Sequence, residues 1–390
     1  MTDEELSLLM YSPLSLTMGA GGDRWLIEVA PRLLRSGVRP TVVASDFVAR
    51  SYCKSTTPWF VKQLRKDGIT YKEIPSMKIF HRMNLPALKT KALKELTRLM
   101  QSHDVTYFMN AYALQDLTVW IAKNLSGKAR VISSQHSTIF QEGYLHNLYI
   151  RLVTKRLLRV FDAYHVLNNE DSTIYRSWGL RNVHMIPNGV DTKRFTPLVQ
   201  KDLSEFTVFF VGRLDYQKGI DIILGAIEEL EASEPEIASQ IVYKICGTGP
   251  MGQMVEKFTE SRSNVTYLGY VSDEELLQHY RSASLCLMPS RRETFGLVAM
   301  EAMASGTPVL VTDIPGPRTF VRNDFGLIVP PEDPHSLANG ISRLFRLCRD
   351  NPDEFASMGH RARNVCVKEY DWNIVAHKLS VMMKRTAEVG

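Results

Sequence analysis

The sequence has few cysteines, and they are not arranged to form cross-links or a metal site. The five cysteines are widely spaced, odd in number and include no CxxC pair, so neither a disulfide framework nor a thiolate zinc site is indicated. The sequence also lacks any run near the about 18 apolar residues of a membrane-spanning helix. Its first residues are acidic where a secretion signal would be basic. These absences predict a folded cytoplasmic protein.

Several short motifs of catalytic and metal-binding proteins are also missing. No aspartate lies two positions from another aspartate, so the carboxylate pair that commonly holds Mg²⁺ or Mn²⁺ on a nucleotide is absent. The P-loop, HExxH and GxSxG motifs do not occur either. We therefore expect no metal ion and no bound cofactor.

Charge is distributed unevenly along the chain. Residues 1–190 hold 25 Lys and Arg against 15 Asp and Glu, a net +10, whereas residues 191–390 hold 22 against 27, a net −5. The basic half favours an anionic partner such as a nucleic acid, a membrane surface or an anionic substrate, although a solvated basic surface explains it equally well. No stacking platform or nucleic-acid motif accompanies the basic residues, so nucleic-acid binding is not expected.

Short β-branched apolar runs alternate with helix-period segments along the chain, which predicts an α/β fold with two doubly wound parallel sheets. The expected strands are 6–11, 41–44, 105–110, 131–134, 163–167, 207–211, 241–246, 265–268, 285–288, 308–312 and 326–329. The expected helices are 25–35, 87–101, 220–231, 251–260, 274–282, 297–305, 334–349, 352–368 and 371–385.

Proline and Asn-Gly interrupt this pattern at 186–191, just before the charge changes sign. We place an amino-terminal domain at 1–190, a carboxyl-terminal domain at 191–370 and a terminal helix at 371–390 that returns to the first domain. Ligands of open α/β sheets lie beyond the carboxyl ends of the strands. Two such sheets facing each other would form one cleft, so we expect functional residues in the loops that follow strands.

Three loops of the second half carry candidate site residues. Arg213 and Lys218 follow an expected strand, where two cations could hold a diphosphate or form a solvated basic loop. Gly247 lies in a Gly-Thr-Gly turn that allows close backbone approach to a ligand or simply a change of direction. Glu293 and Glu301 flank a helix start, where their carboxylates could bind sugar hydroxyls. Alternatively, Glu293 caps the helix and Glu301 is a surface residue.

Two loops of the first half carry weaker signals. Gly21 and Gly22 lie between an expected strand and helix, where glycines suit backbone contact with a phosphate. The neighbouring Asp23 also fits an early-turn acid that favours the helix dipole. His136 follows the strand 131–134, and a lone histidine at such a place is more often structural than part of a site.

These segments together resemble a known family. GRLDYQKG at 212–219, GTGPM at 247–251 and PSRRETFGLVAMEAMASGTPV at 289–309 look like the donor domain of glycosyltransferase family 4. Members of that family are retaining sugar transferases with the GT-B fold, two Rossmann-like domains. The resemblance extends over essentially the whole chain but is much more specific in its second half. One departure is Asp23, where many relatives have Glu.

The resemblance implies a role for each candidate. Arg213 and Lys218 would hold the diphosphate of a nucleotide sugar, Glu301 its ribose and Glu293 the transferred sugar. The remaining implied contacts are the amides of Phe295, Gly296 and Leu297 against sugar and phosphate, His136 against the sugar from the other domain, Gly21, Gly22 and Gly247 close to the ligand, and the backbone near Tyr270 and Val271 against the base. Transfer would proceed with retention, without a metal and without a protein nucleophile.

The acceptor is not identified by this resemblance. Segments 87–101 and 151–159 are basic and amphipathic, which favours peripheral contact with an anionic membrane and a lipid-linked or cell-envelope glycan acceptor, although helices packed on a sheet have the same pattern. A soluble acceptor, a catalytically inert GT-B binding subunit and a nucleotide-sugar epimerase of related architecture are the alternatives.

Overall fold

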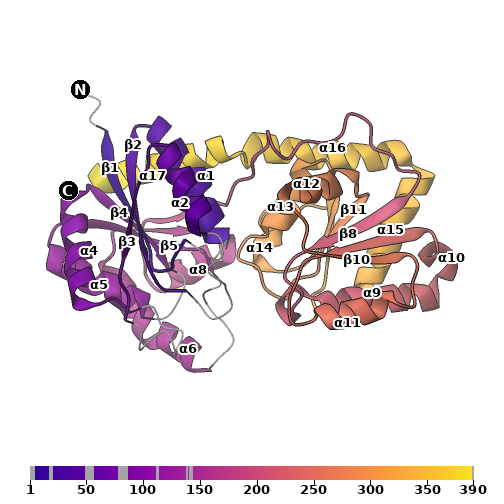
Figure 1. Ribbon diagram of the computed structural model, residues 1–390, viewed down its shortest axis with the longest axis horizontal. Coiled ribbons are helices and arrows are strands. Elements are labelled where there is room, and N and C mark those ends of the chain that lie inside the picture. The colour runs from indigo at the N-terminus through magenta and orange to yellow at the C-terminus, as the bar shows by residue number, and fades with distance from the viewer. Residues whose placement is uncertain are drawn as a thin grey trace. The chain divides into compact units, whose positions relative to one another are not determined.

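The computed structural model describes residues 5–16, 21–48, 57–77, 87–110, 114–137, 139 and 144–388. The chain divides into two compact units, residues 1–188 with 372–390 and residues 189–371 (Figure 1). The sequence predicts divisions at 190/191 and 370/371, one or two residues from these positions. Each unit contains one parallel sheet, so the expected α/β fold is confirmed.

The sheet of unit 1 has the order β3-β2-β1-β4-β5-β6-β7, with every neighbouring pair parallel. Its strands are β1 (Leu6–Ser12), β2 (Val38–Ser45), β3 (Thr70–Ile74), β4 (Val105–Asn110), β5 (Arg130–Gln135), β6 (Ala163–Val166) and β7 (Val183–Met185). The main helices are α1 (Gly21–Arg35), α2 (Thr57–Lys66), α4 (Thr90–Ser102), α5 (Gln115–Ser126), α6 (Tyr144–Tyr149) and α8 (Asn169–Ser177).

Unit 2 repeats this plan with the order β10-β9-β8-β11-β12-β13, again all parallel. Its strands are β8 (Phe206–Val211), β9 (Ile241–Cys246), β10 (Val265–Gly269), β11 (Leu285–Met288), β12 (Val309–Thr312) and β13 (Gly326–Val329). Its helices are α9 (Ile220–Ser233), α10 (Pro235–Ala238), α11 (Gly252–Thr259), α12 (Asp273–Ser282), α13 (Leu297–Ala304), α14 (Pro315–Arg318), α15 (Pro334–Asp350) and α16 (Pro352–Glu369).

In both sheets the chain moves outward in one direction and then restarts on the other side of the first strand. The reversal lies between β1 and β4 in unit 1 and between β8 and β11 in unit 2. At such a reversal the loops leaving two adjacent strands diverge, which opens a crevice at the carboxyl edge of the sheet. This topology directs the search for a site to the loops after β1 and β4 and after β8 and β11.

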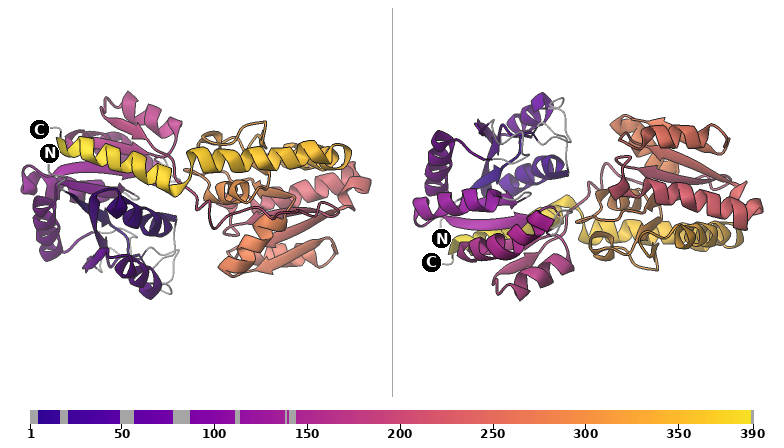
Figure 2. Two further views of the ribbon diagram at one scale, coloured as in Figure 1. Left: turned by 90° about the horizontal axis from the view of Figure 1, so that it is seen from above. Right: turned by 90° about the horizontal axis from the view of Figure 1, so that it is seen from below.

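The last helix, α17 (Trp372–Glu388), packs on unit 1 although it follows unit 2 in sequence (Figure 2). Val375, Leu379 and Met383 are fully buried in the same core cluster as α1 and one face of the sheet. Lys384 Nζ donates a 3.0 Å hydrogen bond to the carbonyl of Ser36, at the end of α1. Unit 1 is therefore completed by both ends of the chain.

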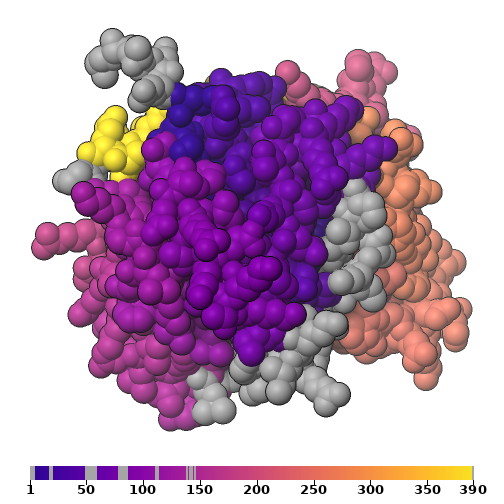
Figure 3. Space-filling model, turned by 60° about the vertical axis from the view of Figure 1, so that its left-hand side comes forward, coloured from indigo at the N-terminus to yellow at the C-terminus, as the bar shows by residue number. Residues whose placement is uncertain are grey.

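A second core cluster covers the other face of this sheet, under α4 and α5 on the side of the unit seen in Figure 3. Ala92, Leu96 and Met100 of α4 are fully buried in it. The apolar face of this basic helix thus packs on the sheet, and α4 offers a partner only its charged outer face. None of the helices in the described part of the chain is both long and apolar enough to cross a membrane.

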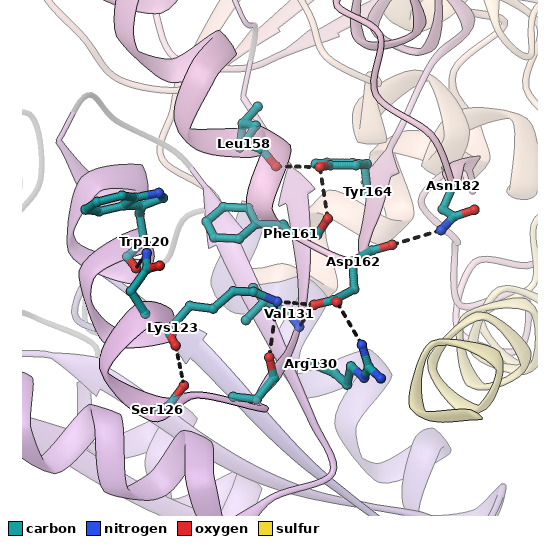
Figure 4. Close-up of polar contacts among 12 residues, drawn as sticks. Trp120, Lys123, Ser126, Arg130, Val131, Leu158, Phe161, Asp162, Tyr164 and Asn182 are labelled. Atoms are coloured by element: carbon teal, nitrogen blue, oxygen red, sulfur yellow. Dashed lines mark hydrogen bonds and ion pairs between the residues drawn. The ribbon is translucent and has the colours of Figure 1, made fainter. Parts of the chain in front are cut away.

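An ionic network ties the amino ends of β5 and β6 together, at the edge opposite the functional loops (Figure 4). Asp162 forms ion pairs with Lys123 of α5 and with Arg130 at 3.3 Å, and it accepts a 2.8 Å hydrogen bond from the amide of Val131. Its own carbonyl accepts a 3.0 Å hydrogen bond from Asn182 Nδ2. This aspartate fixes strand ends and has a structural role.

Candidate active site

Asp215 organises the loop after β8, which carries the two candidate cations. This aspartate caps the short turn 216–218 by accepting a 3.0 Å hydrogen bond from the amide of Lys218, and its other oxygen forms an ion pair with Arg213. The Arg213 side chain remains 42% exposed. The side chain of Lys218 turns in the other direction and pairs with Glu293 of the loop after β11.

Arg291 joins the loop after β11 to the loop after β8 and to the start of α9. The amide of Arg291 donates a 2.9 Å hydrogen bond to the carbonyl of Gln217. The Arg291 guanidinium lies 3.5 Å from the centre of the Tyr216 ring and forms a bidentate pair with Asp221 at 2.8 and 2.7 Å. Since bidentate pairing and stacking fix a guanidinium in orientation, these contacts hold Lys218 and Glu293 at a constant separation.

Glu293 is further positioned by its own loop. Ser290 Oγ donates a 3.2 Å hydrogen bond to Glu293 Oε1, the oxygen that also pairs with Lys218. Thr312 of β12 anchors this loop through a 2.5 Å hydrogen bond from its hydroxyl to the carbonyl of Ser290. An ordered carboxylate and ammonium therefore lie together at the β8/β11 reversal, where a phosphate or a sugar hydroxyl could compete for either.

Helix α13 begins directly after this loop. Gly296 precedes it with φ 106°, and a Cβ there would lie 2.9 Å from Met288 Cε. Phe295 is buried against Phe320, with ring centres 4.9 Å apart. The first amides of a helix have no intrahelical acceptor and carry the positive end of its dipole. The start of α13 at Leu297 can therefore bind an anion beside Lys218.

Glu301 lies in the second turn of α13 and is buried. Its Oε2 accepts a 2.8 Å hydrogen bond from the hydroxyl of Tyr280, on α12. Tyr280 is itself fully buried and packs edge-on against Phe209, with ring centres 5.6 Å apart. The carboxylate is therefore fixed within unit 2.

Gly247 packs against the backbone of neighbouring loops. Its φ is 131°, and a Cβ there would lie 1.8 Å from the carbonyl oxygen of Gly212. Its amide donates a 2.7 Å hydrogen bond to Gly269, and its carbonyl accepts a 3.1 Å hydrogen bond from Tyr267. These contacts favour the turn-and-packing interpretation, because Gly247 lets the loops after β8, β9 and β10 approach one another. Val271, just beyond β10, is half-buried beside the exposed Tyr270.

The candidates of unit 1 gather at the corresponding edge of its sheet. Gly21 and Gly22 are the first residues of α1, and a Cβ on Gly22 would touch the Met109 side chain at 3.4 Å. The preceding residues 17–20 of the glycine-rich loop lie outside the described residues. Asp23 is buried.

His136 is half-buried just after β5 and takes part in a chain of aromatic side chains. Its Nε2 lies 3.1 Å from the Tyr107 hydroxyl, which lies 2.6 Å from His165 Nδ1, while His165 Nε2 lies 2.7 Å from the carbonyl oxygen of Ile186. Trp25 packs edge-on against His136 at 4.7 Å between ring centres. Burial lowers the pKa of His136 well below its usual value, and the nearby His165 lowers it further.

The structure thus brings Arg213, Lys218, Glu293, Gly296 and Glu301 to one edge of unit 2, and Gly22 and His136 to the same edge of unit 1. Sequence reasoning missed the side chains that position them. Asp215, three residues before Lys218, has the spacing of an N-cap and could have been found. Tyr280 and His165 carry no such local signal. The described residues contain no group of three or more His, Cys, Asp or Glu able to hold a metal ion.

Comparison with known proteins assigns this arrangement to a family. The family model described as Glycosyl transferases group 1 matches residues 192–364, and the model described as Glycosyltransferase Family 4 matches residues 19–194. The chain belongs to glycosyltransferase family 4. The predicted resemblance is confirmed, and the two matches meet close to the division between units 1 and 2.

Individual relatives carry related names. The chain is 37% identical over 151 residues to an uncharacterized glycosyltransferase of Methanocaldococcus jannaschii, a match that covers 37% of each chain. It is 29% identical over 335 residues to D-inositol 3-phosphate glycosyltransferase 2 of Catenulispora acidiphila, covering 77% of this chain and 74% of the relative. The first two relatives are matched over only 37% and 38% of their own length.

Solved structures share the complete fold. The Anabaena protein HepE in complex with UDP superposes with a TM-score of 0.75 at 17% identity, covering 97% of this chain and 100% of that one. A glycosyltransferase of Rickettsia africae gives a TM-score of 0.76 at 16% identity, covering 99% and 100%. At these identities the likeness establishes the GT-B fold of the chain and nothing further.

Proposed function

We propose that this protein transfers a sugar from a nucleoside diphosphate sugar to an acceptor hydroxyl, with retention and without a metal ion. The proposal rests on one arrangement above all. Arg213, Lys218 and the start of α13 surround the β8/β11 reversal, and Glu293 and Glu301 offer carboxylates beside them. That arrangement supplies positive charge for a diphosphate and hydrogen-bond acceptors for sugar hydroxyls.

In the proposed reaction the bond between the sugar anomeric carbon and the diphosphate oxygen breaks, and a bond to the acceptor oxygen forms on the same face. The acceptor proton passes to the departing diphosphate. Lys218 and Arg213 would stabilise the charge that develops on that group, since fixed cations outside bulk water stabilise a transition state without reorganising. Glu293 would orient the sugar, Glu301 would bind the ribose, and the backbone near Val271 would contact the base.

Lys218 in particular must exchange one partner for another. It is paired with Glu293 here, and a diphosphate would compete for the same ammonium. Binding would release Glu293 toward the sugar hydroxyls, so one ligand would reorganise both side chains. The support for this role is geometric, because the two loops that carry Lys218 and Glu293 are fixed to each other by Arg291.

The test is a thermal-shift series with UDP, GDP, ADP and their common sugar conjugates, with EDTA present. UDP is the first choice because HepE was crystallised with UDP and with UDP-glucose. A ligand that binds only the folded state stabilises it by RT ln(1 + [L]/Kd). We expect the nucleotides of one base to raise Tm of the wild type and of Lys257→Ala, a control in which an exposed lysine is removed. The same nucleotides should not raise Tm of Lys218→Ala.

Turnover separates the alternatives. Lys218→Ala should lower kcat/KM at least about a hundredfold, whereas Lys257→Ala should leave it unchanged. Near wild-type kcat/KM in Lys218→Ala would refute its role. Nucleotide binding without sugar transfer would indicate an inert GT-B subunit. Isomerisation of the sugar in the absence of an acceptor would indicate an epimerase. A product with inverted anomeric configuration would refute retention. Activity that EDTA abolishes and Mg²⁺ restores would refute metal independence.

We further propose a lipid-linked or cell-envelope acceptor, reached from the cytoplasmic face of an anionic membrane. The support lies in α6 and the helical residues that continue it to Val160. Tyr144, Leu148 and Leu152 are 80%, 36% and 49% exposed and recur every four residues, so they share one face. Arg156 and Arg159 are exposed further along, and neither pairs with a described carboxylate. We call these five residues the α6 stripe.

The α6 stripe is an exposed apolar row followed by cations, which is the pattern of a helix that lies on anionic lipid. We expect the protein to sediment with vesicles containing anionic lipid and less well with neutral vesicles or at high salt. Leu148→Gln with Leu152→Gln should weaken sedimentation, as should Arg156→Gln with Arg159→Gln. The control Lys91→Gln with Lys94→Gln removes the same charge from the outer face of α4. Failure to bind anionic vesicles at any salt concentration would refute membrane contact and leave a soluble acceptor.

A further inference from the structure

The hydrogen bonds that link Ile186, His165, Tyr107 and His136 favour one arrangement of protons near neutral pH. The Ile186 carbonyl can only accept, so His165 Nε2, 2.7 Å away, carries a proton. Burial lowers the pKa of His165 to about 4, so the ring is neutral and its Nδ1 is an acceptor. Burial raises the pKa of Tyr107, so the phenol keeps its proton and donates it to His165 Nδ1 at 2.6 Å.

These constraints extend to His136. The Tyr107 hydroxyl uses its one O–H to donate a hydrogen bond to His165, so toward His136 its oxygen can only accept. His136 Nε2, 3.1 Å away, must therefore donate. Burial also keeps this ring neutral, and a neutral imidazole has a single N–H. The other nitrogen, Nδ1, is consequently left with a lone pair.

The sheet explains how side chains of non-adjacent strands meet. Tyr107 lies on β4 and His165 on β6, with β5 between them. The β5 residue paired with His165 is Ser134, whose small side chain leaves room for the phenol and the imidazole to meet across the strand. Trp25 of α1 covers the phenol, with the rings 5.2 Å apart and 10° from parallel. Strand register and packing thus hold the chain in place.

We propose that Tyr107 and His165 are positioning residues that hold His136 in the tautomer with hydrogen on Nε2, so that its Nδ1 accepts a hydrogen bond from a hydroxyl of the sugar being transferred. This inference rests on the proposed function for its ligand, but the fixed tautomer is a property of the unliganded protein. An Nδ1 acceptor selects a hydroxyl donor and rejects a group that lacks a proton, because the facing lone pairs would be left unpaired.

A matched variant pair tests the proton arrangement directly. Tyr107→Phe removes the central hydroxyl. Tyr164→Phe removes a buried hydroxyl from β6 that points to the opposite face and donates to the carbonyls of Leu158 and Phe161 (Figure 4). In ¹⁵N-histidine-labelled full chain, with the signal assigned by its loss in His136→Gln, we expect wild type and Tyr164→Phe to show Nδ1 unprotonated. Tyr107→Phe should give a mixture of tautomers.

Rescue tests the role of the outer histidine. His165→Gln supplies an amide N–H donor and a carbonyl acceptor in place of the two ring nitrogens, so it should preserve the His136 signature, whereas His165→Leu should lose it. A wild-type His136 protonated on Nδ1, or an unchanged signature in Tyr107→Phe, would overturn the inference. Thermal denaturation of each variant confirms that the compared proteins are folded.

Kinetics tests the sugar contact. We expect Tyr107→Phe to lower kcat/KM for the nucleotide sugar about tenfold, while Kd for UDP, which lacks the sugar, stays at the wild-type value. Tyr164→Phe should change neither. An altered tautomer with unchanged kcat/KM would overturn the sugar contact. If wild type neither binds nor uses any nucleotide sugar, the proposed function fails, and the tautomer experiment still decides whether the positioning chain exists.

Discussion

At the scale of single residues, the charged groups of unit 2 are held in place by neutral and acidic partners that lie within the same motifs. Asp215 holds Arg213, and Ser290 supports the Glu293 that pairs with Lys218. Each pairing reduces the conformational freedom that a ligand would otherwise have to remove on binding. The loops that carry these charged groups are therefore ordered before a ligand arrives, although Lys218 and Glu293 would still exchange partners on binding.

The Gly247 position makes a residue-scale prediction for stability. In Gly247→Ala the added Cβ would lie 1.8 Å from the Gly212 carbonyl oxygen, and the residue would have a φ of 131°. We expect this clash to lower the free energy of unfolding by at least about 3 kcal/mol. Gly269→Ala is the control, because its φ is also positive but nothing lies within 4 Å of the added Cβ. It should cost only about 1 kcal/mol. Urea denaturation measures both, and equal losses would contradict the backbone clash.

His165 makes a prediction for pH dependence. Its pKa is lowered from 6.5 to about 4 by burial, so between these values the unfolded chain binds more protons than the folded one. The contribution of the neutral His165 ring to the free energy of unfolding is fully present above pH 6.5. It falls by about 3 kcal/mol as the pH is lowered toward 4. His165→Gln does not titrate. The free energy of unfolding of wild type minus that of His165→Gln should therefore fall over this window, and a constant difference would contradict burial of a neutral ring.

At the scale of elements, the sequence predicts a strand well where the strand is buried. The strands 241–246, 285–288 and 326–329 have the bounds expected from their apolar runs. The edge strands β3 and β7 were missed, because β3 is mostly charged or polar and β7 has only three residues. Both are strands because a neighbour pairs with them, a fact that no local pattern contains.

The candidate site also has residues that the sequence predicts and residues that it does not predict. Loops after strands were predicted, because parallel strands bring their carboxyl ends to one edge, and the loop residues were found at those edges. The partners Tyr280 and His165 were not predicted, since each reaches its target from an element distant in sequence. Their placement depends on strand register and helix packing, which the residues near Glu301 and His136 do not encode.

Helix α17 makes an element-scale prediction. Leu379 is fully buried in the core cluster shared with α1, so Leu379→Ala should lower the free energy of unfolding of unit 1 by about 2–5 kcal/mol through lost contacts and a cavity. The control Val367→Ala changes a 41% exposed side chain of α16 and should stay within about 0.5 kcal/mol of wild type. Denaturation followed by signals from unit 1 measures the difference. A small effect of Leu379→Ala would show that α17 is not needed to complete that core.

At the scale of the whole molecule, the chain forms two units with separate sheets and cores and passes between them at Asn188–Gly189 and Asp371–Trp372. Units with separate cores can unfold separately. We therefore expect calorimetry to resolve two transitions. Leu379→Ala should lower the one that belongs to unit 1, although residue 379 follows all of unit 2 in sequence.

The same experiment connects architecture to function. The residues proposed to bind the nucleotide lie in unit 2, so UDP at a hundred times its Kd should stabilise the transition of unit 2 by about 2.7 kcal/mol. It should leave the transition of unit 1 nearly unchanged, and Lys218→Ala should remove the shift without altering either transition in the absence of UDP. If UDP instead raised only the transition that Leu379→Ala lowers, the nucleotide would bind unit 1, and the assignment of Arg213 and Lys218 to the diphosphate would be wrong.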